Sequence, residues 1–253
     1  MLVVMNSLPG GILVLLRAAV LLSLLLSGVS QAKSIVVTAG EWQGYTHANG
    51  SGLYFDILRE ALNQPDLKMH IRVSNWKRAK HSFLAGRADI LICDYKTAQR
   101  GWFYPRWHLD YDPSVKVFSM TPLKSLTELA DQPVGWLLGY DFDQYLPVQV
   151  KAYEVASHAE GFQLLSHGRL KAFISYQMHV PAALQSQLSA IELQQARAMY
   201  PVFRDDLQGR LLAKAYDEGM LRLYQSGRLK TLFNNAALYQ QARFSEAAEQ
   251  APD

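Results

Sequence analysis

Short strand-like segments alternate with helix-like segments through the first part of the chain, and this alternation restricts the fold to the α/β class. Three segments have the length and the β-branched or alternating apolar content of strands: 34–38, 69–73 and 88–93. Two segments between them carry helix signals: 53–62 and 75–86. Strands joined by helices in this way predict a mostly parallel sheet covered by helices.

A second block repeats the alternation after an interruption at residues 111–122. It contains predicted strands and helices at 134–138, near Asp143, at 159–167 and 170–175, then a crossing segment at 198–205 and two closing helices at 207–226 and 228–241. Residues 242–253 are polar and rich in Ala, Glu and Gln, and are predicted to be disordered. Two such blocks predict two lobes.

The N-terminal segment has the composition of a secretory signal peptide. Arg17 precedes an apolar run, Ala18–Leu26. The small residues Ser30 and Ala32 then occupy the −3 and −1 positions of a cleavage site before Lys33. The alternative is an uncleaved membrane anchor, which is disfavoured because Arg17 interrupts the apolar stretch and leaves it short for a span. Residues 1–32 are therefore predicted to be removed on export.

Cysteine content, charge and motifs limit the compartment, the partners and the kind of activity expected for the protein. Cys93 is the only cysteine, so no internal disulfide can form, and an exported protein of this size without one fits a bacterial periplasm. The 25 Lys and Arg residues are scattered and nearly balanced by 22 Asp and Glu, so nucleic acid is not an expected partner. The seven histidines have no metal-ligand spacing, and no phosphate loop or nucleophile motif occurs. We therefore expect binding without catalysis, and neither metal nor cofactor.

The position of a ligand site follows from the strands, because ligands of open α/β sheets bind beyond the carboxyl ends of the strands. Four segments lie at such ends: Glu41–Tyr45, Asp94–Arg100, Gly139–Asp141 and Tyr176–Gln177. Two come from each block, so they are predicted to meet in a cleft between the lobes.

Arg100 is the main candidate in this cleft, because a guanidinium can bind a ligand carboxylate through two parallel hydrogen bonds. The alternative is a surface arginine, or one paired with Asp94 or Asp110. Arg78 is a candidate second cation, with a solvated helix face as the alternative. Gly139 could free backbone N–H groups for an anion, or form a plain turn.

Aromatic residues are candidates for the walls of the site, where they could stack on a ligand or enclose a cation. They are Trp42, Tyr45, Tyr95 and Trp107. The alternative for each of them is packing in the core.

The chain carries five segments in a recognisable order: GSGLYFDILREAL, NWKRAKHSFLAGRADILICDYKTAQR, LTELADQPVGWLLGY, LLSHGRLKAFISY and LRLYQSGRLKTLF. Together they resemble the family 3 extracellular solute-binding proteins, periplasmic receptors associated with polar amino acid uptake. The resemblance implies a two-lobed type II periplasmic-binding fold, each lobe a mostly parallel sheet covered by helices, with two crossing strands as hinge. Lobe 1 would comprise 33–118 plus 204–241, and lobe 2 would comprise 121–200.

The resemblance also implies roles for individual residues. Arg100 looks like the arginine that clamps a ligand α-carboxylate, and Tyr95 stands where a small residue supplies a hydrogen bond. Trp42 or Tyr45 is similar to the aromatic residue that stacks on the ligand. Gly139-Tyr140-Asp141 stands where the family often has Gly-Thr-Thr, which helps to hold the carboxylate.

Two departures put an ordinary α-amino acid ligand in doubt. Amino-acid binders of this family place an Asp where this chain has Tyr176, and that Asp meets the ligand ammonium. Asp141 adds negative charge where a ligand carboxylate would be received, which is unfavourable at short range. Asp94 or Asp141 could supply the missing charge for an ammonium group, which is costly to bury without a partner.

The resulting hypothesis is a monomeric periplasmic solute-binding protein that closes two lobes around a small polar or carboxylate-bearing solute, amino-acid-like or an organic acid. It would deliver this solute to an inner-membrane ABC permease or to a sensor protein. Two alternatives remain open. One is a dehydratase-like periplasmic enzyme on the same fold, and the other is a degenerate relative that serves as an interaction module.

Overall fold

The computed structural model describes residues 33–249. The predicted signal peptide at 1–32 and the chain end at 250–253 lie outside this range. Within the described residues, no helix has both the length and the apolar content needed to cross a membrane.

The first of two sheets is a mixed sheet with the strand order β2-β1-β3-β11-β4, and β5 pairs with β11 beside it. These strands are Leu67–Ser74 (β2), Lys33–Gly40 (β1), Ile90–Asp94 (β3), Arg197–Arg204 (β11), Trp102–Phe103 (β4) and Asp110–Asp112 (β5). β1 and β3 are parallel, whereas β11 runs antiparallel to β3. The sheet is therefore less uniformly parallel than the alternation predicts, because the late crossing segment returns through it.

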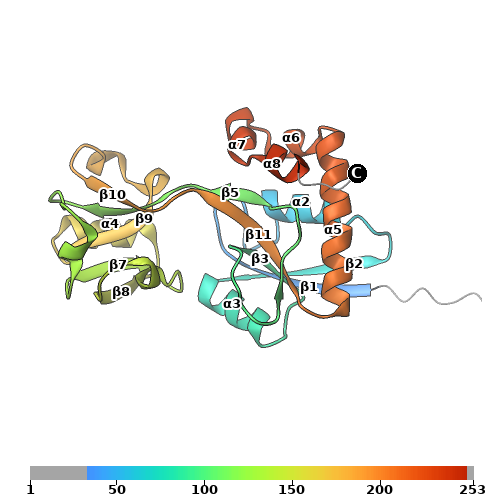
Figure 1. Cartoon of the computed structure of the whole chain (residues 1–253), viewed down its shortest axis with the longest axis horizontal. Helices are drawn as coiled ribbons and strands as arrows, with labels where there is room; N and C mark the ends of the chain where they lie inside the picture. Colours follow the sequence, from blue (N-terminus) through green and yellow to red (C-terminus); the bar gives the residue numbers. More distant parts are fainter. Residues whose placement is uncertain (1–32, 250–253) are drawn as a thin grey trace, which may run out of the picture. The chain divides into compact units, whose positions relative to one another are not determined.

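Six helices belong with this sheet, and they come from both ends of the chain (Figure 1). They are α2 (Leu53–Ala61), α3 (Trp76–Leu84), α5 (Leu207–Gln225), α6 (Arg228–Phe233), α7 (Ala236–Gln241) and α8 (Phe244–Glu249).

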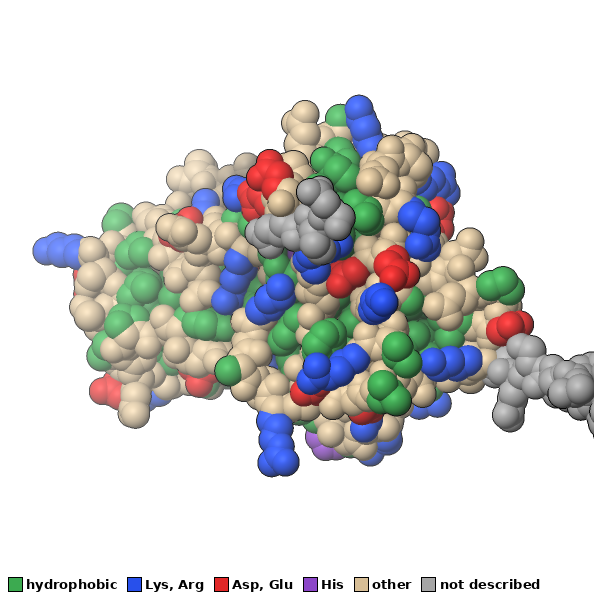
Figure 2. Space-filling model, turned by 45° about the vertical axis from the view of Figure 1, so that its right-hand side comes forward, with side chains coloured by type: hydrophobic (Ala, Val, Ile, Leu, Met, Phe, Trp, Pro, Cys, Tyr) green, Lys and Arg blue, Asp and Glu red, His purple; other side chains and the backbone are tan. Residues whose placement is uncertain are grey.

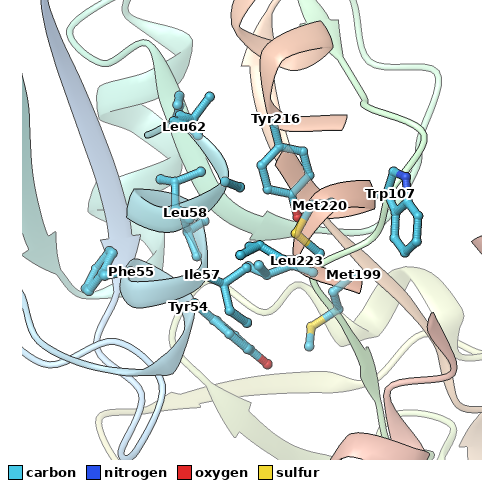
Figure 3. Close-up of a cluster of buried hydrophobic side chains, with 14 of the residues drawn as sticks. Tyr54, Phe55, Ile57, Leu58, Leu62, Trp107, Met199, Tyr216, Met220 and Leu223 are labelled. Atoms are coloured by element: carbon cyan, nitrogen blue, oxygen red, sulfur yellow. The ribbon is translucent and has the colours of Figure 1, made fainter. Parts of the chain in front are cut away.

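Helices α2 and α5 pack closely against each other over the first core. A Cβ atom on Gly219 would lie 2.0 Å from the carbonyl oxygen of Ala61, so only glycine allows this approach. Figure 3 shows side chains of α2, such as Leu58, beside those of α5, such as Met220. Tyr54 lies at the margin of this cluster with its hydroxyl directed away from Leu58. The core thus fixes the ring of Tyr54 and leaves its polar end free for other partners.

The second sheet has the order β10-β6-β9-β7-β8 and is also mixed. Its strands are Ser189–Gln194 (β10), Val115–Ser119 (β6), Ala172–Tyr176 (β9), Pro133–Leu137 (β7) and Lys151–Val155 (β8). Helix α4 (His158–Ser166) packs on it, and Gly161 gives the ring of Phe173 its space, since a Cβ there would lie 2.1 Å from that ring. Four short 3₁₀ turns complete it: Leu126–Leu129, Phe142–Tyr145, Gln177–His179 and Ala182–Leu184.

Strands β5 and β11 run side by side in opposite directions where the chain passes between the two sheets (Figure 1). The chain enters the second sheet between β5 and β6 and returns between β10 and β11. The two passages lie at residues 113–114 and 195–196, whereas the sequence predicts lobe boundaries at 118–121 and 200–204. In the β5–β11 pair, Asp112 lies opposite Arg197 and Asp110 lies opposite Met199.

The C-terminal segment differs from its prediction. The helix expected over 228–241 is interrupted at Asn234, whose φ of 48° is left-handed, and the side chain of Asn235 then caps α7. Helix α8 occupies part of the segment predicted to be disordered. It forms because Phe244, which is 2% exposed, stacks on His108 and contacts Trp107 in the first core.

Candidate functional site

A pocket of about 430 Å³ lies where the carboxyl ends of β1 and β3 face residues that follow strands of the second sheet. Trp42 and Asp94 contribute to it from the first sheet, and Tyr140 and Tyr176 from the second. Its volume is in the range of small-molecule sites in proteins. The pocket is therefore the candidate ligand site.

Eight aromatic side chains contribute to its walls. Those that line it are Trp42, Tyr54, Trp76, Tyr95, Tyr140, Phe142, Tyr145 and Tyr176. Trp42 is held by backbone pairing with Thr46, and the Thr46 hydroxyl donates to the carbonyl of Gly40. Tyr45 does not line the pocket but supports it from behind, with its ring centre 4.6 Å from that of Trp42.

The carboxylate of Asp112 is the most deeply buried charged group of the pocket, at 2% exposure. Its Oδ2 accepts hydrogen bonds from the hydroxyls of Tyr95 and, at 2.8 Å, Tyr176. Burial raises its pKa to about 6, while the two tyrosine hydroxyls act in the opposite direction. Its Oδ1 is also buried and has no hydrogen-bond partner among residues 33–249.

Asp110 lies two residues earlier on the same strand, so its side chain is on the same face of β5. It accepts hydrogen bonds from the Tyr54 hydroxyl at 2.9 Å and from the Tyr111 N–H at 2.7 Å. Burial raises its pKa to about 7. Asp110 does not line the pocket, so it acts on the site through Tyr54.

Two further carboxylates line the pocket, Glu41 and Asp94. Asp94 accepts a hydrogen bond from the Tyr95 N–H at 2.8 Å, and burial raises its pKa. Lys80 is the one Lys or Arg among the described residues that line the pocket, and its Nζ lies 3.6 Å from a carboxylate oxygen of Asp141. The charged lining is therefore mainly acidic.

Arg197 stands beside the pocket without lining it. Its guanidinium carbon lies 3.4 Å from the ring centre of Tyr95 and 5.1 Å from that of Tyr145, and Nη2 donates to the Tyr145 hydroxyl at 3.3 Å. It lowers the pKa of Asp112 through space, but no ion pair joins the two in the described part of the chain.

The structure brings together half of the predicted site residues. Those that line the pocket are Trp42, Asp94, Tyr95, Tyr140 and Tyr176. Those that do not are Tyr45, Arg78, Arg100, Gly139 and Asp141. Arg78 and Arg100 are exposed, and neither is among the residues that line the pocket. Trp107, another candidate wall, is fully buried in the first core.

The predicted anion-binding turn at Gly139 is occupied by a side chain of the protein. The N–H of Gly139 donates to Glu154 at 2.7 Å, and the other oxygen of Glu154 lies 3.2 Å from Nζ of Lys77. Lys77 belongs to α3, over the first sheet, whereas Glu154 belongs to β8 of the second. Together with Lys80 and Asp141, these residues link the two sheets beside the pocket.

Three of the residues that matter most here are not predicted from the sequence: Asp110, Asp112 and Arg197. The signal for the first two is the alternation in Asp110-Tyr111-Asp112, at the start of the interruption in the strand pattern. The signal for Arg197 is its place directly before the predicted crossing segment. Neither signal says what these residues face, because that depends on the pairing of β5 with β11.

Ser175, His158 and Cys93 are side chains of types that act in catalysis, and burial affects each of them. Ser175 contacts His158 at 2.8 Å, and the His158 ring stacks on His179, which lines the pocket. Ser175 is fully buried, however, and burial lowers the pKa of His158 to about 3. Burial also raises the pKa of the Cys93 thiol well above its ordinary value. No set of three or more His, Cys, Asp or Glu side chains within 33–249 is placed to hold a metal ion.

Comparison with solved structures identifies the class of fold, which is the two-lobed periplasmic-binding fold of mixed α/β type. The substrate-binding protein of an amino acid ABC transporter is 18% identical with a TM-score of 0.61, covering 79% of this chain and 97% of that one. A histidine kinase sensor domain with similarity to periplasmic binding proteins is 16% identical with a TM-score of 0.63, covering 81% and 96%.

A putative L-cystine ABC transporter from Listeria monocytogenes is similar to the same degree. It is 18% identical with a TM-score of 0.62, covering 79% of this chain and 94% of that one. No protein-family model matches the chain, and no curated protein sequence matches it. At these identities the likeness establishes the fold, and the function has to be argued from the site.

Proposed function

We propose that the chain is an exported solute-binding protein, which holds one small polar solute between its two sheets and presents the closed form to a membrane partner. The proposed site is the aromatic pocket and not a clamp centred on Arg100. The mature protein would begin at Lys33 in the periplasm. An ABC permease and a sensor kinase are both candidate partners, since fold neighbours are named for each role.

The single observation that carries this proposal is the composition of the pocket wall, to which both sheets contribute. A ligand in such a pocket contacts both sheets at once and therefore stabilises their closed arrangement. The contact of Lys77 with Glu154 outside the pocket provides a second link of the same kind. On the face seen in Figure 2, Lys and Arg side chains are interspersed with Asp and Glu.

A thermal-shift screen of the chain from Lys33 to Asp253 tests the proposal. The library contains amino acids, amines, organic acids, sugars and short peptides. A solute that binds the folded state raises the unfolding midpoint by mass action, and at about a hundredfold excess over its dissociation constant it stabilises by about 3 kcal/mol. If no compound of the library raises the unfolding midpoint of the folded protein, solute binding is contradicted.

Matched variants locate the binding. Trp42→Ala removes an aromatic wall of the pocket and should abolish the midpoint shift. Tyr153→Ala removes an aromatic side chain that is 50% exposed and outside the pocket, and should leave the shift intact. Equal loss in both variants would contradict the assignment of the site.

A further inference from the structure

The unpaired oxygen of Asp112 is the clearest indication of what the pocket holds. Asp112 is 2% exposed and lines the pocket, and its Oδ2 is satisfied by two tyrosine hydroxyls. Its Oδ1 accepts no hydrogen bond within the described residues, although it is buried. A buried acceptor without a donor is costly, and the cost is removed when a bound group donates to it.

The charges around the pocket favour a cationic donor. Three carboxylates line it, from Glu41, Asp94 and Asp112, against the single ammonium group of Lys80, which is already near Asp141. The neighbouring Arg197 does not line the pocket; its Nη2 donates to Tyr145, and its buried Nε has no hydrogen-bond partner within residues 33–249. In the described part of the chain, no positively charged side chain of the lining is left over for a ligand carboxylate.

The walls favour the same kind of group. Eight aromatic residues line the pocket, and aromatic faces attract a cation that has lost its water. Tyr95 and Tyr176 have a specific arrangement, because their hydroxyls donate to Asp112 and their rings therefore stand beside the carboxylate. A cation at Asp112 would meet the carboxylate and the rings together.

We propose that the pocket selects a protonated amine, whose N–H group donates to Oδ1 of Asp112 while the surrounding aromatic rings enclose the cation, and that a ligand carboxylate is not required. This inference rests on the proposed function and names the class of solute. The binding group comes from β5, one of the two strands that join the sheets.

Matched ligand sets test the inference by isothermal titration calorimetry. Each set contains an amino acid, the amine that lacks its carboxylate and the acid that lacks its amine: for example L-phenylalanine, phenethylamine and 3-phenylpropionate. L-Histidine with histamine, L-arginine with agmatine and L-lysine with cadaverine extend the panel to other side chains. At least one amine should bind no more weakly than its parent amino acid, and the acids should not bind.

Two outcomes would overturn the inference: amines that bind at least tenfold more weakly than their parent amino acids throughout the panel, or acids that bind where amines do not. Either outcome would leave solute binding itself in place, because a solute would still have bound. If no compound of this panel binds but another compound of the wider library does, the amine inference is wrong and the proposed function stands. If no compound of either set binds, both the amine inference and the proposed function are wrong.

Two acid-to-amide variants locate the interaction. Asp112→Asn keeps the shape and removes the charge, so the affinity for the bound amine should fall by about 10- to 150-fold, the range for a charge-assisted hydrogen bond. Asp217→Asn is the control, since this acid of α5 lies outside the pocket lining and accepts hydrogen bonds from the backbone N–H groups of Arg106 and Trp107. It should change the affinity by less than about threefold.

Equal losses in the two variants, or full affinity in Asp112→Asn, would refute the role of Asp112. Circular dichroism and the unfolding midpoint without ligand show whether each variant is folded. The ligand panel uses the unaltered protein, so it decides between amine and acid even if Asp112→Asn does not fold.

Discussion

Asp110 should make the protein less stable as the pH rises from about 4 to about 7. Its carboxyl group is 6% exposed, and burial raises its pKa from 3.8 to about 7. The folded protein therefore keeps a proton on Asp110 over a pH range in which the unfolded chain has already lost it. The folded state binds more protons there, so the free energy of unfolding falls as pH rises.

The magnitude follows from the two pKa values. One pKa unit corresponds to about 1.4 kcal/mol, so the difference between 3.8 and about 7 corresponds to about 4 kcal/mol. Asp110→Asn removes this contribution without opening a cavity. Its amide oxygen can accept from the Tyr111 N–H, and its amide nitrogen can donate to the Tyr54 hydroxyl, so both partners remain satisfied.

Urea unfolding at several pH values between 4 and 8 measures the effect. The free energy of unfolding of the unaltered protein should fall between pH 4 and pH 8 by about 4 kcal/mol more than that of Asp110→Asn. Parallel pH profiles for the two proteins would refute the reasoning, because they would mean that Asp110 titrates alike in the folded and unfolded states.

Asp206 provides a control of opposite sign. It caps α5 by accepting from the Gly209 N–H at 2.8 Å, and this bond lowers its pKa. Its contribution is therefore present at neutral pH and lost as pH falls through the lowered value. Asp206→Asn should differ most from the unaltered protein at pH 8 and least at acid pH.

Three further predictions concern other parts of the molecule. Glu154→Gln weakens the link to Lys77, so solute affinity should fall by about two- to fivefold, mainly through faster dissociation in stopped-flow experiments; slower dissociation would contradict this. Gly161→Ala places a methyl group 2.1 Å from the Phe173 ring and should destabilise the protein to urea by about 1–3 kcal/mol, and an unchanged midpoint would show that the ring can move. Arg100→Ala should change affinity by less than about twofold in calorimetry, whereas a loss of a hundredfold would restore the clamp predicted from the sequence.

The fold was largely predictable because local patterns determine many of its elements. The strands predicted at 34–38 and 88–93 overlap β1 and β3, whose apolar residues are mostly buried, so their composition reveals them. Helix α8 is different, because only contacts with residues far away in the sequence hold it. Phe244 packs on Trp107 and His108, and no feature of the polar tail indicates those partners.

The predicted residues that line the pocket are each the last residue of a strand or lie within three residues after it. Asp94 and Tyr95 reach the pocket in this way at the end of β3. Beyond them, the hydroxyl of Tyr104 donates to the carbonyl of Tyr95 at 2.8 Å and accepts from the Thr97 N–H at 3.2 Å. This segment is therefore held against Tyr104, and Arg100 lies exposed at its end. Sequence spacing contains no information about that hydrogen bonding.

Asp112 supplies the carboxylate that the family resemblance leads us to expect at position 176. Tyr176 stands where the resemblance leads us to expect an acid for a ligand ammonium, and its hydroxyl donates to Asp112 instead. The carboxylate is therefore supplied by β5, whose position is set by backbone pairing with β11, while β9 supplies an aromatic wall. If the pocket holds a protonated amine, the cation would bind to a group fixed at the junction of the sheets. The aromatic residues of the second sheet would then complete the enclosure, so that charge recognition and closure depend on different residues.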